Sequence, residues 1–157
     1  MNQRPSYVYV ASSWRNLMQE AVCATLTAAG IEHYDFKNPE GGTGFSWKEV
    51  KPGIEPSSDL KVKGSDWEPI NEYLRMIAHP RALDGFNADF AAMNRADTFI
   101  LVLPCGKSAH LELGWAVGAG KRTAILLEDP VEPELMYRMV DYMAPTLFNL
   151  LGWLGVD

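Results

Sequence analysis

Short apolar runs alternate with amphipathic stretches along most of this sequence. The apolar runs have the length of strands that are buried in a sheet, and they lie at residues 7–11, 31–36, 97–103 and 123–127. The stretches between and after them carry apolar residues at helical spacing, at residues 16–29, 65–79, 80–96, 108–118, 133–143 and 145–154. The pattern predicts an α/β protein in which helices connect parallel strands.

The alternation indicates one domain over residues 1–157, a three-layer α/β/α sandwich of the flavodoxin-like or Rossmann-like kind. We expect a mainly parallel sheet of four to five strands in the order 2-1-3-4, with the fifth strand at an edge. Open α/β sheets bind ligands where the winding reverses, here between the first and third strands. The turns at residues 12–14 and 104–108 should therefore face one crevice.

Several residues mark the expected ends of the helices. Either serine of the turn at residues 12–13 can cap the first helix, and Gly30 lies in the C′ position after it. Ser65 and Glu68 fit a capping box before the next helix. The helical stretch at residues 80–96 is expected to be interrupted near Gly85.

Residues 37–64 form a long segment that is rich in glycine and proline and has no periodicity. Such segments are typical of functional or disordered loops. Because Phe45 and Trp47 lie within it, we expect a lid. The alternative is that these two aromatic residues only pin the loop to the core.

Composition and charge narrow the class of partner. The 157 residues carry a formal net charge of −6, which argues against binding to nucleic acid polymers or anionic membranes. With two cysteines and no cysteine–histidine cluster, no structural zinc is expected. The phosphate loop GxxxxGK[ST] and the dinucleotide motif GxGxxG are missing from the sequence, so we expect no cofactor. With no apolar run near 18 residues and no signal peptide, we expect a cytoplasmic protein.

Two carboxylates are candidates for catalysis. Glu112 lies in the first turns of the helix after the third strand, where a carboxylate is stabilised and faces the crevice. It can act as a nucleophile or stabilise a developing oxocarbenium ion, or it can simply complement the helix dipole. Asp89, in the preceding helix, is a candidate general acid or base, or else a solvated charge on the helix surface.

Residues of both turns are candidates for substrate binding. The backbone amides at the start of the helix can hold a phosphate or a sugar hydroxyl; this group is Gly106, Lys107, Ser108, Ala109 and His110, with Ser108 alternatively an ordinary N-cap. The turn after the first strand offers Ser12, Ser13, Trp14 and Arg15. Tyr9 can orient the nucleophile or pack in the core, and Cys105 beside His110 is an alternative nucleophile.

Three segments resemble the nucleoside 2-deoxyribosyltransferase superfamily, which includes the deoxynucleotide N-glycosidases. They are the first strand and turn at residues 7–13, Asp89 followed eight residues later by Asp97, and residues 108–116 with Gly120-Lys121. The last segment is similar to the signature Glu-x-Gly-x-Ala…Gly-Lys of that superfamily. The resemblance covers residues 6–128.

The resemblance implies that Glu112 attacks C1′ of the sugar and forms a covalent glycosyl-enzyme, with Asp89 as the acid or base and Tyr9 as an orienting group. Water then completes hydrolysis, or a second base completes transfer. Phe45 and Trp47 would stack on the base. The partner would be a small nucleoside or nucleotide, and a homodimer or larger homo-oligomer is expected.

Two features favour the nucleotide-hydrolase branch of the superfamily. Gly106 and Lys107 stand where transferases often carry a further aspartate, and the serine-rich turn fits a 5′-phosphate. Residues 104–112 also partly match the PGGxGTxxE signature of phosphoribohydrolases, and residues 8–15 are similar to TIR domains, some of which cleave NAD. A catalytically silent nucleotide-binding or TIR-like interaction module is the alternative function.

Overall fold

The computed structural model describes residues 3–40, 42, 44–51, 67–128 and 132–156. The chain divides into two compact units. The sheet unit is built from residues 1–36 and 92–157, and the helical unit from residues 37–91. Among the described residues, no helix is long and apolar enough to cross a membrane.

The sheet unit contains five parallel strands in the order β2-β1-β3-β4-β5. They are β1 (Val8–Ala11), β2 (His33–Asp35), β3 (Thr98–Val102), β4 (Arg122–Leu126) and β5 (Tyr142–Ala144). This confirms the predicted fold class, the strand order and the fifth strand at the edge. The winding reverses between β1 and β3, whose residues pair from Val8 with Thr98 to Ala11 with Leu101.

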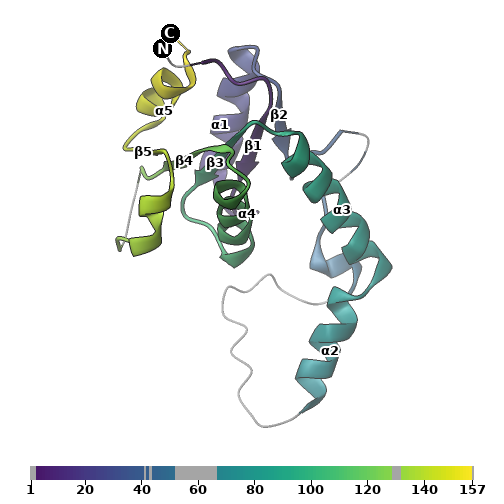
Figure 1. Cartoon of the computed structure of the whole chain (residues 1–157). Coiled ribbons are helices and arrows are strands. Elements are labelled where there is room, and N and C mark those ends of the chain that lie inside the picture. Colours follow the sequence, from purple (N-terminus) through teal and green to yellow (C-terminus); the bar gives the residue numbers. More distant parts are fainter. Residues whose placement is uncertain (1–2, 41, 43, 52–66, 129–131, 157) are drawn as a thin grey trace. The chain divides into compact units, whose positions relative to one another are not determined.

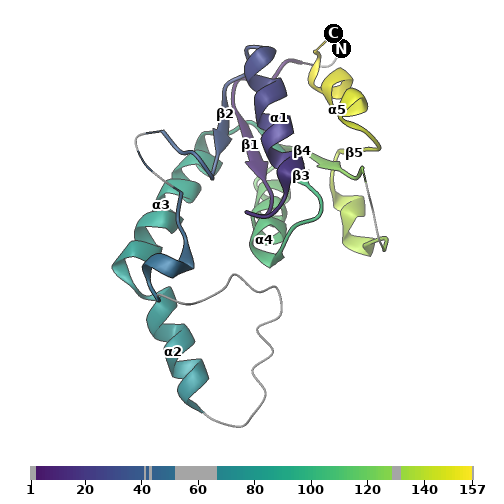
Figure 2. The same ribbon diagram turned by 180° about the vertical axis from the view of Figure 1, so that it is seen from behind.

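Helices cover both faces of this sheet, as Figures 1 and 2 show from opposite sides. On one face, α1 (Leu17–Ala28) and α5 (Leu147–Leu154) pack their apolar residues on those of the strands. On the other face lies α4 (Lys107–Gly118), which contacts β3, β4 and β1. Because β1 and β3 are buried on both faces, their sequences are continuous apolar runs rather than alternating ones.

Backbone and side-chain caps set the ends of these elements. Gly30 has φ +66 after α1, and the amide of Ile31 donates to the carbonyl of Leu26, so the predicted C′ glycine is confirmed. The prediction that a serine caps α1 is wrong, because the side chain of Asn16 accepts the hydrogen bond from the amide of Met18. The Lys121 ammonium donates to main-chain carbonyls at the end of the helix before β3. Lys121 of the Gly120-Lys121 signature therefore connects the segment before β4 to the segment before β3.

One element differs from the sequence-based prediction. Residues 133–143 were predicted to be helical, but Leu135–Met139 form a 3-10 helix, η2, and Tyr142–Ala144 form the edge strand β5. The carboxylate of Asp141 accepts a hydrogen bond from the amide of Thr123 at 2.7 Å, which aligns β5 with β4. A strand of three residues is too short to show a period of two in the sequence.

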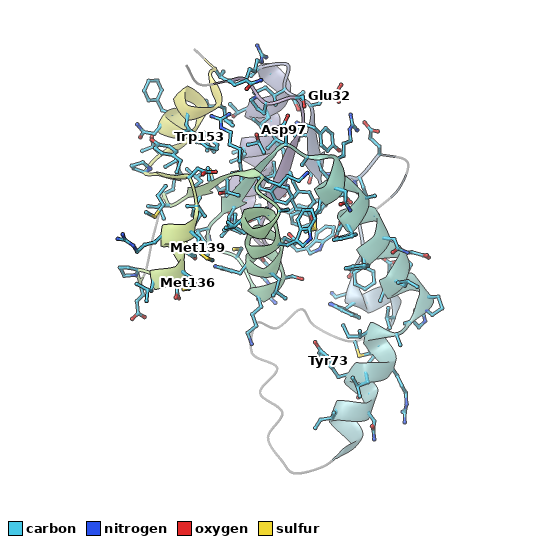
Figure 3. All side chains as sticks on the ribbon, viewed as in Figure 1. Glu32, Tyr73, Asp97, Met136, Met139 and Trp153 are labelled. Atoms are coloured by element: carbon cyan, nitrogen blue, oxygen red, sulfur yellow. The ribbon has the colours of Figure 1, made fainter. Side chains whose placement is uncertain are left out.

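The helical unit contains a 3-10 helix, η1 (Trp47–Glu49), followed by α2 (Trp67–Ile77) and most of α3 (Pro80–Arg95). The predicted interruption near Gly85 is wrong, since α3 is continuous. Gly85 is needed for packing instead, because a Cβ atom there would lie 2.7 Å from Cβ of Phe45. Four apolar residues of α2 are exposed, namely Ile70, Tyr73, Leu74 and Ile77, of which Figure 3 labels Tyr73.

Two sequence-based predictions fall partly outside the described residues. The predicted capping box includes Ser65, and the predicted lid includes residues 41, 43 and 52–64, none of which the structure describes. The described part of that segment has a capping box of its own, in which Ser46 and Glu49 satisfy each other's backbone amides before η1.

Candidate active site

The turns that follow β1 and β3 are held together by side-chain hydrogen bonds. The hydroxyl of Ser12 donates to the carbonyl of Val102 at 2.8 Å. The side-chain nitrogen Nδ2 of Asn16 donates to the carbonyls of Val102 and Pro104, at 3.2 and 3.1 Å. The two turns that were predicted to face one crevice therefore meet at the carboxyl edge of the sheet, where the winding reverses.

The second of these turns leads directly into α4. The N-cap of α4 is Gly106, which offers no side chain to the amides of the first turn. The alternative of Ser108 as the N-cap is therefore wrong, and Ser108 is the second residue of the helix. Lys107 and Ser108 are exposed, whereas Ala109 packs on the sheet. The start of α4 thus presents uncapped backbone donors and one cation to solvent, an arrangement that suits an anion.

Glu112 is half-buried on α4. The residues of α4 that face the sheet are Ala109, Leu113 and Ala116. Glu112 comes three residues before Trp115, whose ring lies 6.0 Å from that of Phe99, so both project from the same flank. Because α4 runs back along β3 from its carboxyl end, Glu112 lies one turn nearer the edge where the two turns meet.

The thiol of Cys105 lies close enough to Glu112 to sense its charge. Burial raises the pKa of Cys105 to about 12, and the negative charge of Glu112 adds to the increase. The thiol therefore stays protonated at neutral pH, which is unsuitable for a nucleophile.

The tautomer of His110 argues against a Cys–His pair as well. Its Nδ1 lies 2.8 Å from the carbonyl oxygen of Gly106, and since that oxygen can only accept, Nδ1 carries the proton. The Sγ of Cys105 is 3.7 Å from the same nitrogen, which cannot take the thiol proton. Nε2 then accepts a hydrogen bond at 2.8 Å from the hydroxyl of Tyr137, whose pKa is raised mainly by burial.

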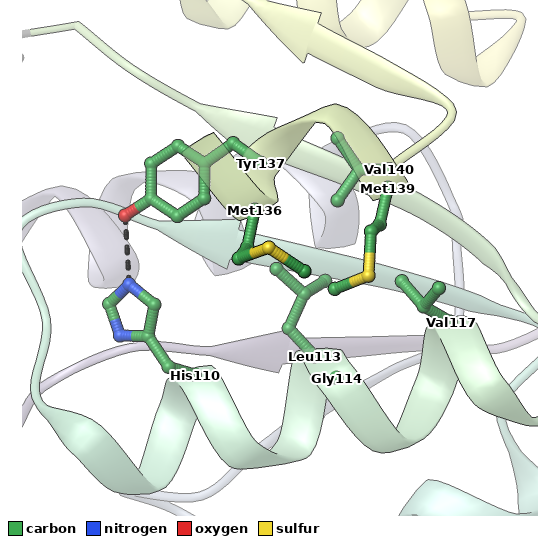
Figure 4. A pocket seen from close by; sticks show the side chains of 8 residues that line it. All are labelled: His110, Leu113, Gly114, Val117, Met136, Tyr137, Met139 and Val140. Carbon is green, nitrogen blue, oxygen red and sulfur yellow. Dashed lines mark hydrogen bonds between the residues drawn. The ribbon is translucent and has the colours of Figure 1, made fainter. Parts of the chain in front are cut away.

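His110 and Glu112 lie on opposite flanks of α4. Two positions along a helix correspond to about 200° of rotation around its axis. His110 faces η2, where its ring stacks on that of Tyr137. Below this pair lies a pocket of about 140 Å³ with apolar walls (Figure 4). Its lining comprises His110, Leu113, Gly114, Val117, Met136, Tyr137, Met139 and Val140. The predicted role of His110 toward a substrate stays a prediction.

The remaining candidates of the sheet unit belong to β1 and its turn. Tyr9 is 1% exposed and stacks between Tyr34 and Phe99, at centroid distances of 5.3 and 5.0 Å. The Oγ of Ser13 accepts a hydrogen bond from the amide of Arg15. The side chains of Trp14 and Arg15 are exposed, and Trp14 makes an edge contact with Phe36 at 5.5 Å.

The other predicted site residues belong to the helical unit. Phe45 and Trp47 make an edge-to-face pair at 4.9 Å, and the guanidinium of Arg81 lies over the Phe45 ring. Asp89 is half-buried on α3. Their roles toward a substrate stay predictions, as does the role of Glu112.

Sequence reasoning missed two residues at this edge. Asn16 directly precedes the helical pattern of α1, which is the position of an N-cap, so a signal was available. Tyr137 comes from a segment that was predicted to be an ordinary helix, and nothing in its spacing indicates contact with His110. Within the described part of the chain, no three His, Cys, Asp or Glu side chains are grouped to hold a metal ion.

Comparison with solved structures links this architecture to a known enzyme. The chain is similar to a structure reported with the characterization of a 2-deoxyribosyltransferase from the psychrotolerant bacterium Bacillus psychrosaccharolyticus. The two chains share a fold. The similarity has a TM-score of 0.54 and covers 96% of this chain and 92% of the other, at 16% identity. No protein-family model and no curated protein matches the sequence. The resemblance noted in the sequence is therefore confirmed at the level of the fold.

Proposed function

We propose that this protein cleaves or transfers the N-glycosidic bond of a nucleoside or nucleotide, with Glu112 as the nucleophile. The observation that carries the proposal is the position of Glu112. It is half-buried beside the joined turns of β1 and β3, in a fold shared with a 2-deoxyribosyltransferase. Ligands of open α/β sheets bind at this place.

The chemistry assigned to Glu112 is a double displacement. A carboxylate oxygen of Glu112 attacks C1′ while the bond from C1′ to the base nitrogen breaks, and the electron pair of that bond leaves with the base. A general acid protonates the base. We assign this role to Asp89, which requires the helical unit to bring it to the sheet edge. Water, which Asp89 deprotonates, then attacks C1′ while the bond from C1′ to the carboxylate of Glu112 breaks, and this releases the sugar. Alternatively the nitrogen of a second base gives its proton to Asp89 and attacks C1′ with the same bond breaking, which completes transfer.

The substrate is held by both turns in this proposal. Arg15 and Lys107 are exposed cations on the first and second turns. With the amides at the start of α4, they favour a substrate that carries a phosphate or a sugar hydroxyl. Trp14 and the pair Phe45–Trp47 offer aromatic surfaces for a base.

The proposal is tested with Glu112→Gln and Glu112→Ala in an assay of free base release. The panel comprises deoxynucleosides, ribonucleosides, their 5′-monophosphates and NAD, with and without a second free base as acceptor. We expect release by the wild type and a loss of about a thousandfold or more in both variants. The matched control is Glu20→Gln, which alters a glutamate in the first turn of α1 and should keep the wild-type rate.

The panel also separates hydrolysis from transfer and from binding alone. A product that forms only with an acceptor base indicates transfer, whereas sugar release without it indicates hydrolysis. If the wild type releases no base from any compound but is stabilised by one of them, the protein is a binding module and the proposed reaction is wrong. Sedimentation of the same preparation tests the proposed homo-oligomer.

A further inference from the structure

The side chain of Asn16 makes three hydrogen bonds at the junction of the two turns. Its Oδ1 accepts from the amide of Met18 at 2.9 Å and thereby caps α1. Its Nδ2 donates to the carbonyl oxygens of Val102 and Pro104. Asn16 is 7% exposed; its bond to Val102 is buried, and those to Pro104 and Met18 are partly buried.

The helix cap alone does not require asparagine. Serine, threonine and aspartate cap helices as well, because a cap needs only an acceptor oxygen. What asparagine adds is an amide nitrogen with two protons, and both are used here on carbonyls that belong to the other turn. The choice of asparagine therefore serves the connection between the turns as well as the start of α1.

The connection lies between the groups that the proposed reaction needs. Arg15 is the residue immediately before Asn16, and Pro104 lies two residues before Gly106, the N-cap of α4. Val102 is the last residue of β3, and its carbonyl also accepts from Ser12. A shift of one turn relative to the other would change the spacing between Arg15 and the start of α4.

We infer that Asn16 is a positioning residue of the proposed site, which fixes the turn of β1 against the turn that leads into α4. It acts through the main chain and touches no reacting atom. The inference rests on the proposed function, and its structural part can be measured without a substrate.

Two substitutions keep the cap and remove the connection. Asn16→Ser retains an acceptor for the amide of Met18 but is too short to reach both carbonyls. Asn16→Asp retains the cap and places a carboxylate against two carbonyl oxygens, which repels them. We expect kcat/KM to fall about tenfold or more in both, with the larger loss in Asn16→Asp, at a temperature well below the unfolding midpoint.

The matched control removes a cap elsewhere. Thr146→Val deletes the side-chain cap of α5, in which the hydroxyl accepts from the amide of Asn149. It should lower the melting temperature while kcat and KM stay at wild-type values. If Asn16→Ser behaves like this control, with stability reduced and kinetics unchanged, the inference is wrong.

Cys105, directly after Pro104, reports on the turn without any substrate. Its alkylation by iodoacetamide at pH 8.5 should be at least fivefold faster in both Asn16 variants than in the wild type. The rate in Thr146→Val should equal that of the wild type. Equal rates in all four proteins would contradict the inference. A wild type that releases no base contradicts the proposed function and the catalytic role of Asn16 with it. An active wild type with unaffected Asn16 variants contradicts the inference alone.

Discussion

At the scale of single residues, the charge of the proposed nucleophile acts on a thiol that keeps its proton. Burial and the charge of Glu112 raise the pKa of Cys105 to about 12. An ordinary cysteine has a pKa near 8.5, so it would be half ionised at pH 8.5. Cys105 is therefore protonated at neutral pH, whereas an ordinary cysteine would be partly ionised.

The raised pKa of Cys105 predicts how its rate of alkylation depends on pH. Only the thiolate reacts with iodoacetamide, and a raised pKa keeps its fraction small until high pH. The alkylation rate should rise about tenfold per pH unit from pH 8 to pH 10, without a plateau near pH 9. Cys105→Ser should release base at a rate within about threefold of the wild type, because the thiol is not the nucleophile.

Glu112→Gln gives a matched test of the coupling. Since the charge of Glu112 contributes to the raised pKa of Cys105, its removal should shift the alkylation profile toward lower pH. Asp35→Asn, at the end of β2, removes a carboxylate that is not among the causes of this shift and should leave the profile in place. A plateau near pH 9 in the wild type, or an unshifted profile in Glu112→Gln, would refute this account of the pair.

At the scale of elements, α4 separates two environments. One flank carries Trp115 toward β3, with Glu112 one turn before it, and the other carries His110 and Val117 toward η2 and the apolar pocket. This separation follows from the helical rotation of about 100° per residue and was already present in the sequence. Cys105 is close to both flanks, since its Sγ lies 3.7 Å from Nδ1 of His110 and its pKa is raised in part by the charge of Glu112.

Two helical glycines predict opposite responses to the same substitution. Replacing glycine by alanine inside a helix normally stabilises by about 0.5–1 kcal/mol. A Cβ atom at Gly114 of α4 meets nothing within 4 Å, so Gly114→Ala should raise the free energy of unfolding by that amount. At Gly85 of α3 the same atom would lie 2.7 Å from the Phe45 Cβ, so Gly85→Ala should be destabilising by about 1–3 kcal/mol.

Urea unfolding of the two variants and the wild type measures both effects. The difference between the two changes in unfolding free energy does not contain the general preference of helices for alanine, because that preference is common to both sites. Stabilisation by Gly85→Ala would show that the contact with Phe45 does not constrain α3, and would support the predicted weakness of the helix at this position instead.

How far the sequence predicts this molecule depends on how each element is recognised. The buried strands β1, β3 and β4 were predictable because both faces are covered, and Gly30 marked the end of α1. β5 was not assigned to its residues, since three residues carry no period. The cap Gly106 has no side chain to signal it, and the need for Gly85 comes from a contact across 40 positions of sequence.

At the scale of the whole molecule, the chain combines a sheet unit that holds Glu112 with a helical unit that holds Asp89, Phe45 and Trp47. The fold is that of a solved 2-deoxyribosyltransferase. The single domain over residues 1–157 stays a prediction, and so does the pairing of the two carboxylates. The proposed reaction needs both units, and its first covalent step forms the bond between C1′ and Glu112.

Covalent trapping tests that step most directly. A nucleoside with fluorine at C2′ destabilises the oxocarbenium-like transition state, and a base that leaves readily allows the first displacement to outrun the second. We expect the intact mass of the wild-type protein to increase by that of the fluorinated sugar, with the adduct on Glu112 after peptide mapping and no adduct in Glu112→Gln. Base release without an adduct, or an adduct on another residue such as Asp89 or Cys105, would contradict the account.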